Sequence, residues 1–388
     1  MNEMISKYSA ENRHYFDWAA TAVPELPSPN TVFSFGNPSS LHHEGRSARE
    51  ALENARARCA SVLGVPVETV YFTSGGTESN CIPLYSCLAR HGGGRILASA
   101  AEHSSVTENL QTLERLGKPI GRIPLDSSGA VTGELLSKAL EKYSDTRFAA
   151  IMAVNNETGT INNMAALRDI LRNREGPPIH FHCDMVQTAG KIPLDIADWD
   201  IDSASLSAHK IGGPRGIGLL YLRRPLETLY TGGGQERGVR PGTENVAGAL
   251  ALARCLELHA LPEKLERELT EARRRWKHLL AALSKIERCR LIPAERDIDD
   301  EHFSPYIVQA GFKNIPGEVM VRTLDDAGFA VSTGSACSSH SPERPVLAAM
   351  GVEDTLSLEG IRISQGWSTT DEEIDLLIDA ITEVLKFL

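Results

Sequence analysis

Short runs of apolar residues alternate with longer stretches in which apolar residues recur every three or four positions. The short runs predict strands at 70–73, 95–98, 148–154, 179–183 and 217–222. The longer stretches predict helices at 45–63, 77–90, 104–116, 135–142 and 164–174. This alternation indicates an α/β fold with a mostly parallel mixed sheet that carries helices on both faces.

The pattern changes near residue 244, where an almost wholly helical stretch begins and runs to 284 with one interruption at Pro262. Beyond it, strands are predicted near Tyr306 and Phe329, and helices at 316–326 and from Asp371 onward. A chain of 388 residues is too long for one ordinary core. We therefore expect a large domain over 15–255 and a smaller α+β C-terminal domain over 256–388, which also takes in residues 1–14.

Composition narrows the class of protein. The formal net charge of −11 argues against a general nucleic-acid binder, although it leaves room for a local basic patch. No stretch reaches the ~18 apolar residues of a membrane span, and the polar first 15 residues do not resemble a secretory signal. The seven cysteines are odd in number and form no C-x-x-C pair. That pattern fits neither a disulfide framework nor a structural zinc site, so we expect no metal and a cytoplasmic location.

Two short segments carry the clearest chemistry. Ser207-Ala208-His209-Lys210 offers a lysine, which can form a Schiff base with an aldehyde cofactor such as pyridoxal phosphate. The segment 331–339 consists of small residues around Cys337, and a thiol on such a loop can attack a bound intermediate. Taken alone, a lysine is usually a surface residue and a cysteine usually a small buried apolar one.

Polar residues also gather where the predicted strands end. The segment 73–80 places Gly75 and Gly76 before a helix, as in a phosphate-binding turn. Asp184 follows another strand and could pair with a pyridine nitrogen, and His103 could stack on a planar cofactor. The amides of 154–159 suit a carboxylate or a phenolic oxygen. Each of these also has an ordinary structural interpretation, such as a helix cap or a loop side chain.

Two further segments suit anions. The glycine-rich stretch 232–243 contains Arg237, Arg240 and Thr243, so it could approach an anion, or else serve as a flexible linker. Arg362 lies in the strand-like run 360–364, where its guanidinium could hold a substrate carboxylate in a two-bond contact or form a surface salt bridge.

In this order, the segments resemble the cysteine desulfurases, which are pyridoxal-phosphate enzymes of the class V aminotransferase group with aminotransferase fold type I. The resemblance runs from about Tyr15 to Leu388. It covers 15–21, 36–42, 45–46, 74–80, 102–103, 154–160, 184–191, 206–210 and 232–243, together with the Cys337 loop and Arg362. Many ordered matches are more specific than any single motif.

The resemblance implies a set of residue roles. Lys210 would bind the cofactor and move the α-proton, and Cys337 would take the sulfur as a persulfide. His103 would stack on the ring and act as an acid or base. The remaining implied contacts are Asp184 to the pyridine nitrogen, Gln187 to the phenolic oxygen, Gly76, Thr77, Ser207, His209 and the partner subunit's Thr243 to the phosphate, and Asn155 and Arg362 to the substrate carboxylate.

The resemblance also implies the reaction and the partners. A homodimer would use pyridoxal 5'-phosphate to convert L-cysteine into L-alanine and a protein persulfide, for iron–sulfur cluster assembly or tRNA thiolation. The sulfur would pass to an acceptor protein, with no membrane and no direct nucleic-acid contact. Selenocysteine lyase and a non-catalytic sulfur-transfer scaffold that binds the cofactor are the alternatives. One departure stands out: Trp18 replaces the usual asparagine, and we expect its bulk to narrow or restack the substrate mouth.

Overall fold

The structure is a computed structural model that describes residues 13–24, 36–89, 93–294, 296, 301–334 and 344–388. Its largest element is a seven-stranded sheet with the order β2-β8-β7-β6-β5-β3-β4. The strands are β2 (Val70–Thr73), β3 (Arg95–Ser99), β4 (Ile120–Ile123), β5 (Thr146–Ala150), β6 (His180–Asp184), β7 (Ser203–Ser207) and β8 (Gly218–Leu222). All pairings are parallel except those of β8, which runs antiparallel to both of its neighbours. The predicted α/β fold with a mostly parallel mixed sheet is confirmed.

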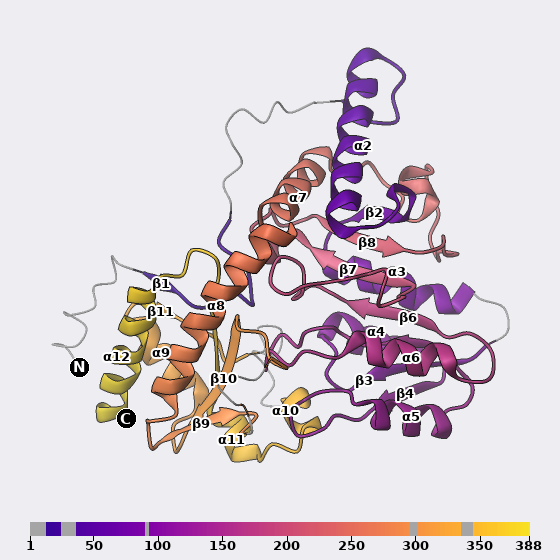
Figure 1. Ribbon diagram of the computed structural model, residues 1–388. Helices are drawn as coiled ribbons and strands as arrows, with labels where there is room; N and C mark the ends of the chain where they lie inside the picture. The colour runs from indigo at the N-terminus through magenta and orange to yellow at the C-terminus, as the bar shows by residue number, and fades with distance from the viewer. Residues whose placement is uncertain (1–12, 25–35, 90–92, 295, 297–300, 335–343) are drawn as a thin grey trace.

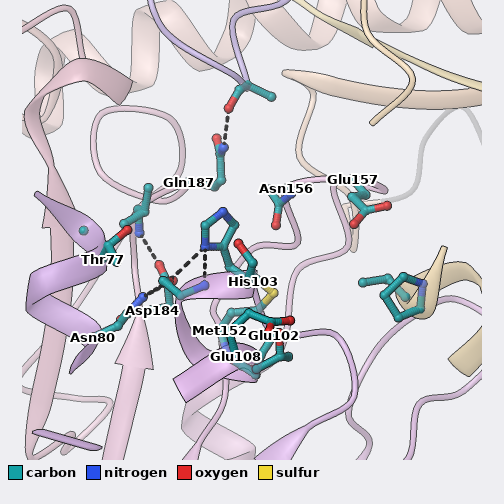
Figure 2. A pocket seen from close by; sticks show the side chains of 18 of the residues that line it. Thr77, Asn80, Glu102, His103, Glu108, Met152, Asn156, Glu157, Asp184 and Gln187 are labelled. Atoms are coloured by element: carbon teal, nitrogen blue, oxygen red, sulfur yellow. Dashed lines mark hydrogen bonds between the residues drawn. The ribbon is translucent and has the colours of Figure 1, made fainter. Parts of the chain in front are cut away.

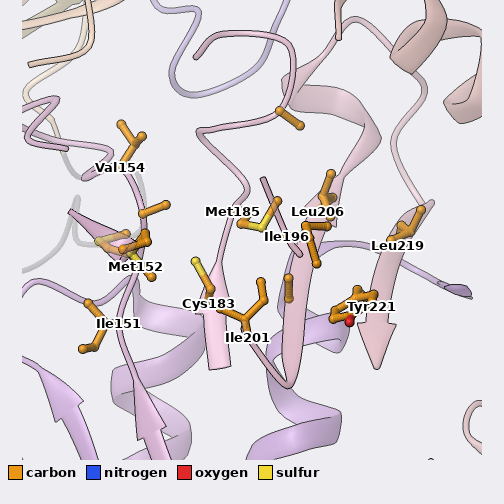
Figure 3. Packing of buried hydrophobic residues seen from close by; sticks show 14 of the residues in the cluster. Ile151, Met152, Val154, Cys183, Met185, Ile196, Ile201, Leu206, Leu219 and Tyr221 are labelled. Atoms are coloured by element: carbon orange, nitrogen blue, oxygen red, sulfur yellow. The ribbon is translucent and has the colours of Figure 1, made fainter. Parts of the chain in front are cut away.

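Helices pack on both faces of this sheet (Figure 1). They are α2 (His43–Leu63), α3 (Gly76–Ala89), α4 (Ser104–Arg115), α5 (Gly133–Lys142), α6 (Met164–Asn173) and α7 (Val246–His259). Successive side chains of a strand point to opposite faces. In β3, Ile96 and Ala98 therefore pack with α3 and α4, whereas Leu97 joins the larger core under α2, α5, α6 and α7. Figure 3 shows part of that larger core, including Ile151, Cys183 and Leu206.

A second, smaller sheet has the order β12-β10-β9 and is antiparallel throughout. Its strands are β9 (Cys289–Ile292), β10 (Ile307–Phe312) and β12 (Gly360–Ser364). The accompanying helices are α8 (Pro262–Leu283), α9 (Gly317–Asp326), α10 (Pro345–Ala349), α11 (Asp354–Glu359) and α12 (Asp371–Phe387). A separate apolar core lies between this sheet and α8, α9 and α12. The division into two domains at 255 stays a prediction.

The N-terminal segment of the described chain lies beside the small sheet. Strand β1 (His14–Tyr15) pairs in parallel with β11 (Phe329–Ala330). Ser364 of β12 then donates its N–H to the carbonyl oxygen of Phe16 at 2.8 Å. The residues that follow, up to Ala22, reach the large sheet, where the N–H of Ala22 donates to the carbonyl oxygen of His209 at 2.9 Å. The N-terminal segment thus connects the two sheets.

The carboxyl ends of parallel strands lie at one edge of a sheet, which is where such sheets bind ligands. The carboxyl ends of β2, β3, β6 and β7 all lie at this edge, and Gly76, His103, Asp184 and Lys210 respectively stand at these ends or shortly after them. Within the described ranges, no helix is both long and apolar enough to cross a membrane.

The predicted strands differ from the observed ones mainly where a buried residue has no strand partner, or where a paired strand is partly exposed. The apolar run 148–154 predicts one strand, but β5 ends at Ala150, and Met152 is buried without a strand partner. Strand β4 is not among the predicted strands, because this edge strand has only two apolar side chains, Ile120 and Ile123, and an exposed Arg122 between them. The room noted for a further strand between Asp184 and Lys210 is filled by β7.

Candidate active site

A cavity of about 920 Å3 opens at the carboxyl edge of the large sheet (Figure 2). It collects side chains from the ends of several strands and from β12 of the small sheet. Nine residues predicted from the sequence line it: Gly76, Thr77, His103, Asp184, Gln187, Ser207, His209, Lys210 and Arg362.

Lys210 ends a 3-10 turn (Ala208–Lys210) that directly follows β7. Its Nζ donates to the carbonyl oxygens of Ala19 at 2.6 Å and Ala20 at 2.9 Å. The amine is therefore held at the cavity wall by two backbone acceptors from the N-terminal segment.

Asp184 is buried at the end of β6, and neutral groups hold its carboxylate. Asn80 Nδ2 donates to Oδ2 at 2.8 Å, and the N–H of Val186 donates to Oδ1 at 2.9 Å (Figure 2). The other amide atom of Asn80, Oδ1, lies 2.9 Å from Nε2 of His182. Burial lowers the pKa of His182 to about 3. A neutral His182 must donate to that oxygen, so the chain of contacts fixes the amide with its N–H toward Asp184.

His103 caps the N-terminus of α4. The N–H of Ser105 donates to its Nδ1 at 3.1 Å, so the neutral ring carries its proton on Nε2. Burial lowers the pKa of His103, the charge of Lys210 acts in the same direction, and Asp184 opposes both. The neutral imidazole is thus favoured before any ligand binds.

One part of the cavity is suited to an anion. Gly76 and Thr77 begin the 14-residue helix α3, whose first N–H groups have no partners within the helix. A Cβ on Gly76 would lie 2.7 Å from Cγ2 of Val186, so glycine allows this close approach. Ser207 and His209 line the same cavity. Burial lowers the pKa of His209 to about 4.

Gln187 lines the cavity between two fixed contacts. Its Nε2 donates to the carbonyl oxygen of Ala19 at 2.8 Å, the same oxygen that accepts from Lys210. Its Oε1 accepts from Nζ of Lys191 at 2.6 Å, and Lys191 is only 2% exposed. The family resemblance implies no role for Lys191.

Arg362 reaches the cavity from β12 and is only 2% exposed. Its Nη1 donates to the carbonyl oxygens of Asn156 at 2.9 Å and Gly334 at 2.7 Å. Its Nη2 forms an ion pair with Oδ1 of Asp17 at 2.7 Å. A substrate carboxylate at this position would have to share the guanidinium with Asp17.

Three further residues of the cavity wall were not assigned a role in the sequence analysis. Glu102 and Glu157 are buried, and in each case Oε2 has no hydrogen-bond partner in the described part of the chain. Burial raises the pKa of Glu102 to about 7 and also raises that of Glu157. Asn156 also lines the wall. The polar runs at 102–103 and 154–159 were the available signal, but they did not show which members face inward.

Several expected residues lie elsewhere. Asn155 does not line the cavity, because its Oδ1 accepts from the N–H groups of Glu157 and Thr158 and its Nδ2 donates to Ala101. Thr243 is exposed and is absent from the wall of this cavity. Cys337 lies outside the described residues.

The expectation for Trp18 is not met. Its side chain is 3% exposed, does not line the cavity and packs edge-on against Trp367 at a ring-centroid distance of 5.5 Å. A Cβ on Gly366 would lie 2.0 Å from the indole, so the glycine makes room for this ring. The bulk of Trp18 is therefore accommodated in the protein interior and does not narrow the mouth.

The glycine-rich stretch 232–243 is anchored by a buried ion pair. Both oxygens of Glu236 accept from Arg56 at 2.7 Å, and Oε2 also accepts from the N–H of Phe72 at 2.7 Å. Glu236 adopts a φ of 46°, a region that side chains rarely occupy. The arginines expected to meet an anion have protein partners here: Arg240 pairs with Glu78 at 3.3 Å, and Arg237 donates to a backbone carbonyl at 2.8 Å.

Comparisons with known proteins agree with this geometry. The sequence model described as "Aminotransferase class-V" matches residues 14–377. The cysteine desulfurase IscS of Dictyoglomus turgidum is 38% identical over 391 residues, covering 96% of this chain and 95% of the relative. A solved NifS-like protein superimposes with a TM-score of 0.84 at 34% identity, covering 97% of this chain and 100% of that one.

A second solved structure, SspA in complex with cysteine, superimposes with a TM-score of 0.75 at 28% identity, covering 90% of this chain and 98% of that one. The family match and the near-complete coverage of the relatives confirm the resemblance drawn from the sequence. The chain belongs to the class-V aminotransferase family and, within it, to the cysteine desulfurases.

Proposed function

We propose that this chain is a pyridoxal-phosphate-dependent cysteine desulfurase that converts L-cysteine into L-alanine and leaves the sulfur as a persulfide on Cys337. The observation that carries the proposal is the meeting of Lys210, Asp184 and His103 at one cavity. Their amine, carboxylate and imidazole come from three different strand ends. The relatives of this chain are cysteine desulfurases, which is consistent with these groups.

The residues present fit the cofactor. Asp184 provides a buried carboxylate for a pyridine nitrogen, Lys210 an amine for an aldehyde, and His103 a flat ring. The start of α3, with Thr77 and Ser207, provides donors for a phosphate. When bound, pyridoxal phosphate supplies an aldehyde for the amine and a ring that stabilises negative charge beside the bond being broken.

The protein's own groups would then divide the work. Lys210, once released from the carbonyl oxygens of Ala19 and Ala20, can accept and return the α-proton. His103 can donate from Nε2. Arg362 would hold the substrate carboxylate beside its ion pair with Asp17.

The proposal gives sulfur transfer to Cys337, and the family resemblance and the environment of four other thiols support it. Burial raises the pKa of Cys59 and Cys289 to about 12, and it also raises the pKa of Cys81 and Cys183. A thiol needs its thiolate form to attack sulfur, so these four are poor nucleophiles. In the transfer, the Cys337 sulfur bonds to the substrate sulfur, the substrate's carbon–sulfur bond breaks, and the carbon left behind takes a proton to give alanine.

The proposal extends to a homodimer, a sulfur-acceptor protein and a cytoplasmic location. Thr243 is exposed and does not line its own chain's cavity, which supports a role at the partner's phosphate site. No disulfide joins the six cysteines in the described ranges, which suits a reducing compartment. The acceptor would serve iron–sulfur cluster assembly or tRNA thiolation. Sedimentation with activity assays tests the dimer, and a fully active monomer would contradict the shared site.

The test of the main proposal is direct. Purified protein loaded with pyridoxal phosphate is incubated with L-cysteine and a reductant, and alanine and sulfide are quantified together. We expect equal amounts of the two products, and we expect Cys337→Ser to form neither. If the parent protein produces no alanine, the proposed function is wrong.

A further inference from the structure

Lys191 is a buried cation that the mechanism above does not use. It is 2% exposed and lies in the turn that follows β6, seven residues after Asp184. Lysine is almost never fully buried unless it is paired with a carboxylate. Among the described residues, the hydrogen-bond acceptor of its Nζ is the amide oxygen Oε1 of Gln187 at 2.6 Å, and no ion pair forms.

This contact determines which way the amide of Gln187 faces. In its charged form, which is still populated at pH 7, the Lys191 amine has only donors to offer, so it then requires an oxygen as its partner. Oε1 must therefore lie toward Lys191, and Nε2 must lie on the other side, where it donates to the carbonyl oxygen of Ala19 at 2.8 Å. Gln187 lines the cavity, and Lys191 does not. Lys191 thus makes Gln187 a hydrogen-bond donor at the cavity wall.

We propose that Lys191 is a positioning residue for the cofactor: it locks the amide of Gln187 with its N–H groups available to the phenolic oxygen of pyridoxal phosphate. This inference rests on the proposed function, because it needs that cofactor. Without Lys191, the carbonyl oxygen of Ala19 alone would hold the orientation of the amide. A rotated amide would turn Oε1 toward the phenolic oxygen of the cofactor, and these two oxygens would repel each other.

The surroundings of Lys191 disfavour its charged form, so we expect it to contribute little to stability. Burial, with the charges of Lys210 and Arg362 in the same direction, lowers its pKa to about 7. An amine kept where its charged form is disfavoured costs folding free energy at neutral pH. Proteins commonly keep a destabilising residue where it serves ligand binding, so this free-energy cost is consistent with a binding role for Lys191.

The test compares cofactor affinity with apo-protein stability. Lys191→Met is expected to weaken pyridoxal-phosphate binding about 10-fold or more, the usual effect of losing one hydrogen bond to a charged group. The melting temperature of the cofactor-free variant is expected to be unchanged or higher. Affinity is measured by absorbance titration of the cofactor-free protein, and stability by circular dichroism.

A double-mutant cycle with Gln187→Ala separates positioning from other effects. If Lys191 acts through Gln187, Lys191→Met costs less than about twofold in affinity when Gln187 is already alanine. Gln187→Glu retains the contact with Lys191 but loses the N–H donor, so it should bind the cofactor as weakly as Lys191→Met while folding normally. It keeps the inference testable if Lys191→Met does not fold.

Arg275→Met is the matched control. Arg275 is also a buried cation whose Nε donates to a glutamine oxygen, Oε1 of Gln365, at 3.1 Å, and neither residue lines the cavity. It should lose stability and keep cofactor affinity. Equal losses for Lys191→Met with and without Gln187, or no loss at all, would overturn the inference. A parent protein that does not bind pyridoxal phosphate would instead overturn the proposed function.

Discussion

Removing the charge of Glu236 should strongly destabilise the large sheet. Glu236→Gln preserves the shape of the side chain but turns an N–H2 group toward the donors of Arg56, which is 3% exposed. Two contacts of 2.7 Å with the guanidinium and one of 2.7 Å with the N–H of Phe72 depend on this carboxylate. The carboxylate that remains beside Arg56, Glu53, is half exposed and compensates weakly. Removing the buried partner of a buried charge costs about 3–5 kcal/mol. That is more than about 100-fold in the unfolding equilibrium.

The assay is urea unfolding of the cofactor-free protein, followed by far-ultraviolet circular dichroism. The same guanidinium provides the control, because Glu53 also pairs with Arg56, at 3.1 Å, but has a 49% exposed side chain. Glu53→Gln should cost less than about 1 kcal/mol, as exposed ion pairs generally do. If the two variants shift the unfolding midpoint equally, burial does not determine the strength of this ion pair and the reasoning fails.

Three further predictions concern the cavity. Burial raises the pKa of Glu102 from 4.5 to about 7, so its contribution to stability falls as the pH rises through that window. Glu102→Gln should therefore match the parent near pH 4.5 and exceed it at pH 8 by up to about 3 kcal/mol in urea unfolding, and a pH-independent difference would contradict this. Asn80→Ala removes a donor from Asp184 and should weaken cofactor binding about 10-fold in an absorbance titration, whereas Asn109→Ala, outside the cavity, should not. When the parent protein is treated with pyridoxal phosphate and then borohydride, we expect mass spectrometry to show the cofactor covalently attached, and Lys210→Ala should lose this added mass. An equal added mass on the variant would exclude this lysine.

The sequence predicted correctly that several residues at strand ends gather at one cavity. His103, Asp184 and Lys210 all stand at or just past strand ends, and parallel strands deliver their ends to one edge, so pattern alone brings them together. The order of the motifs then matched a known family, which supplied roles that spacing could not. Lys210 and Asp184 therefore needed no structure to be nominated.

The failures have a common physical origin, which is the direction in which a side chain points. Asn155 and Asn156 are adjacent amides, and only the hydrogen bonds of the local turn determine that Asn155 faces inward to the backbone while Asn156 lines the cavity. Trp18 is equally ambiguous, because its placement depends on Gly366, which is distant in the sequence. The contact of Asn80 with Asp184 joins residues 104 positions apart. Periodicity and propensity are local, so they do not report such contacts.

The pairing of the N-terminal segment with β11 and β12 bears on when the site can form during synthesis. The carbonyl oxygens of Ala19 and Ala20 hold Lys210, and their segment is fixed through Phe16 to Ala330 and Ser364, at 2.8 Å in each case. A ribosome makes the lysine long before it makes these two anchoring residues. The large sheet can begin to fold on the nascent chain, as N-terminal units generally do. We therefore expect the lysine pocket to close only after β12 has been synthesised, so that cofactor capture follows the emergence of Ser364.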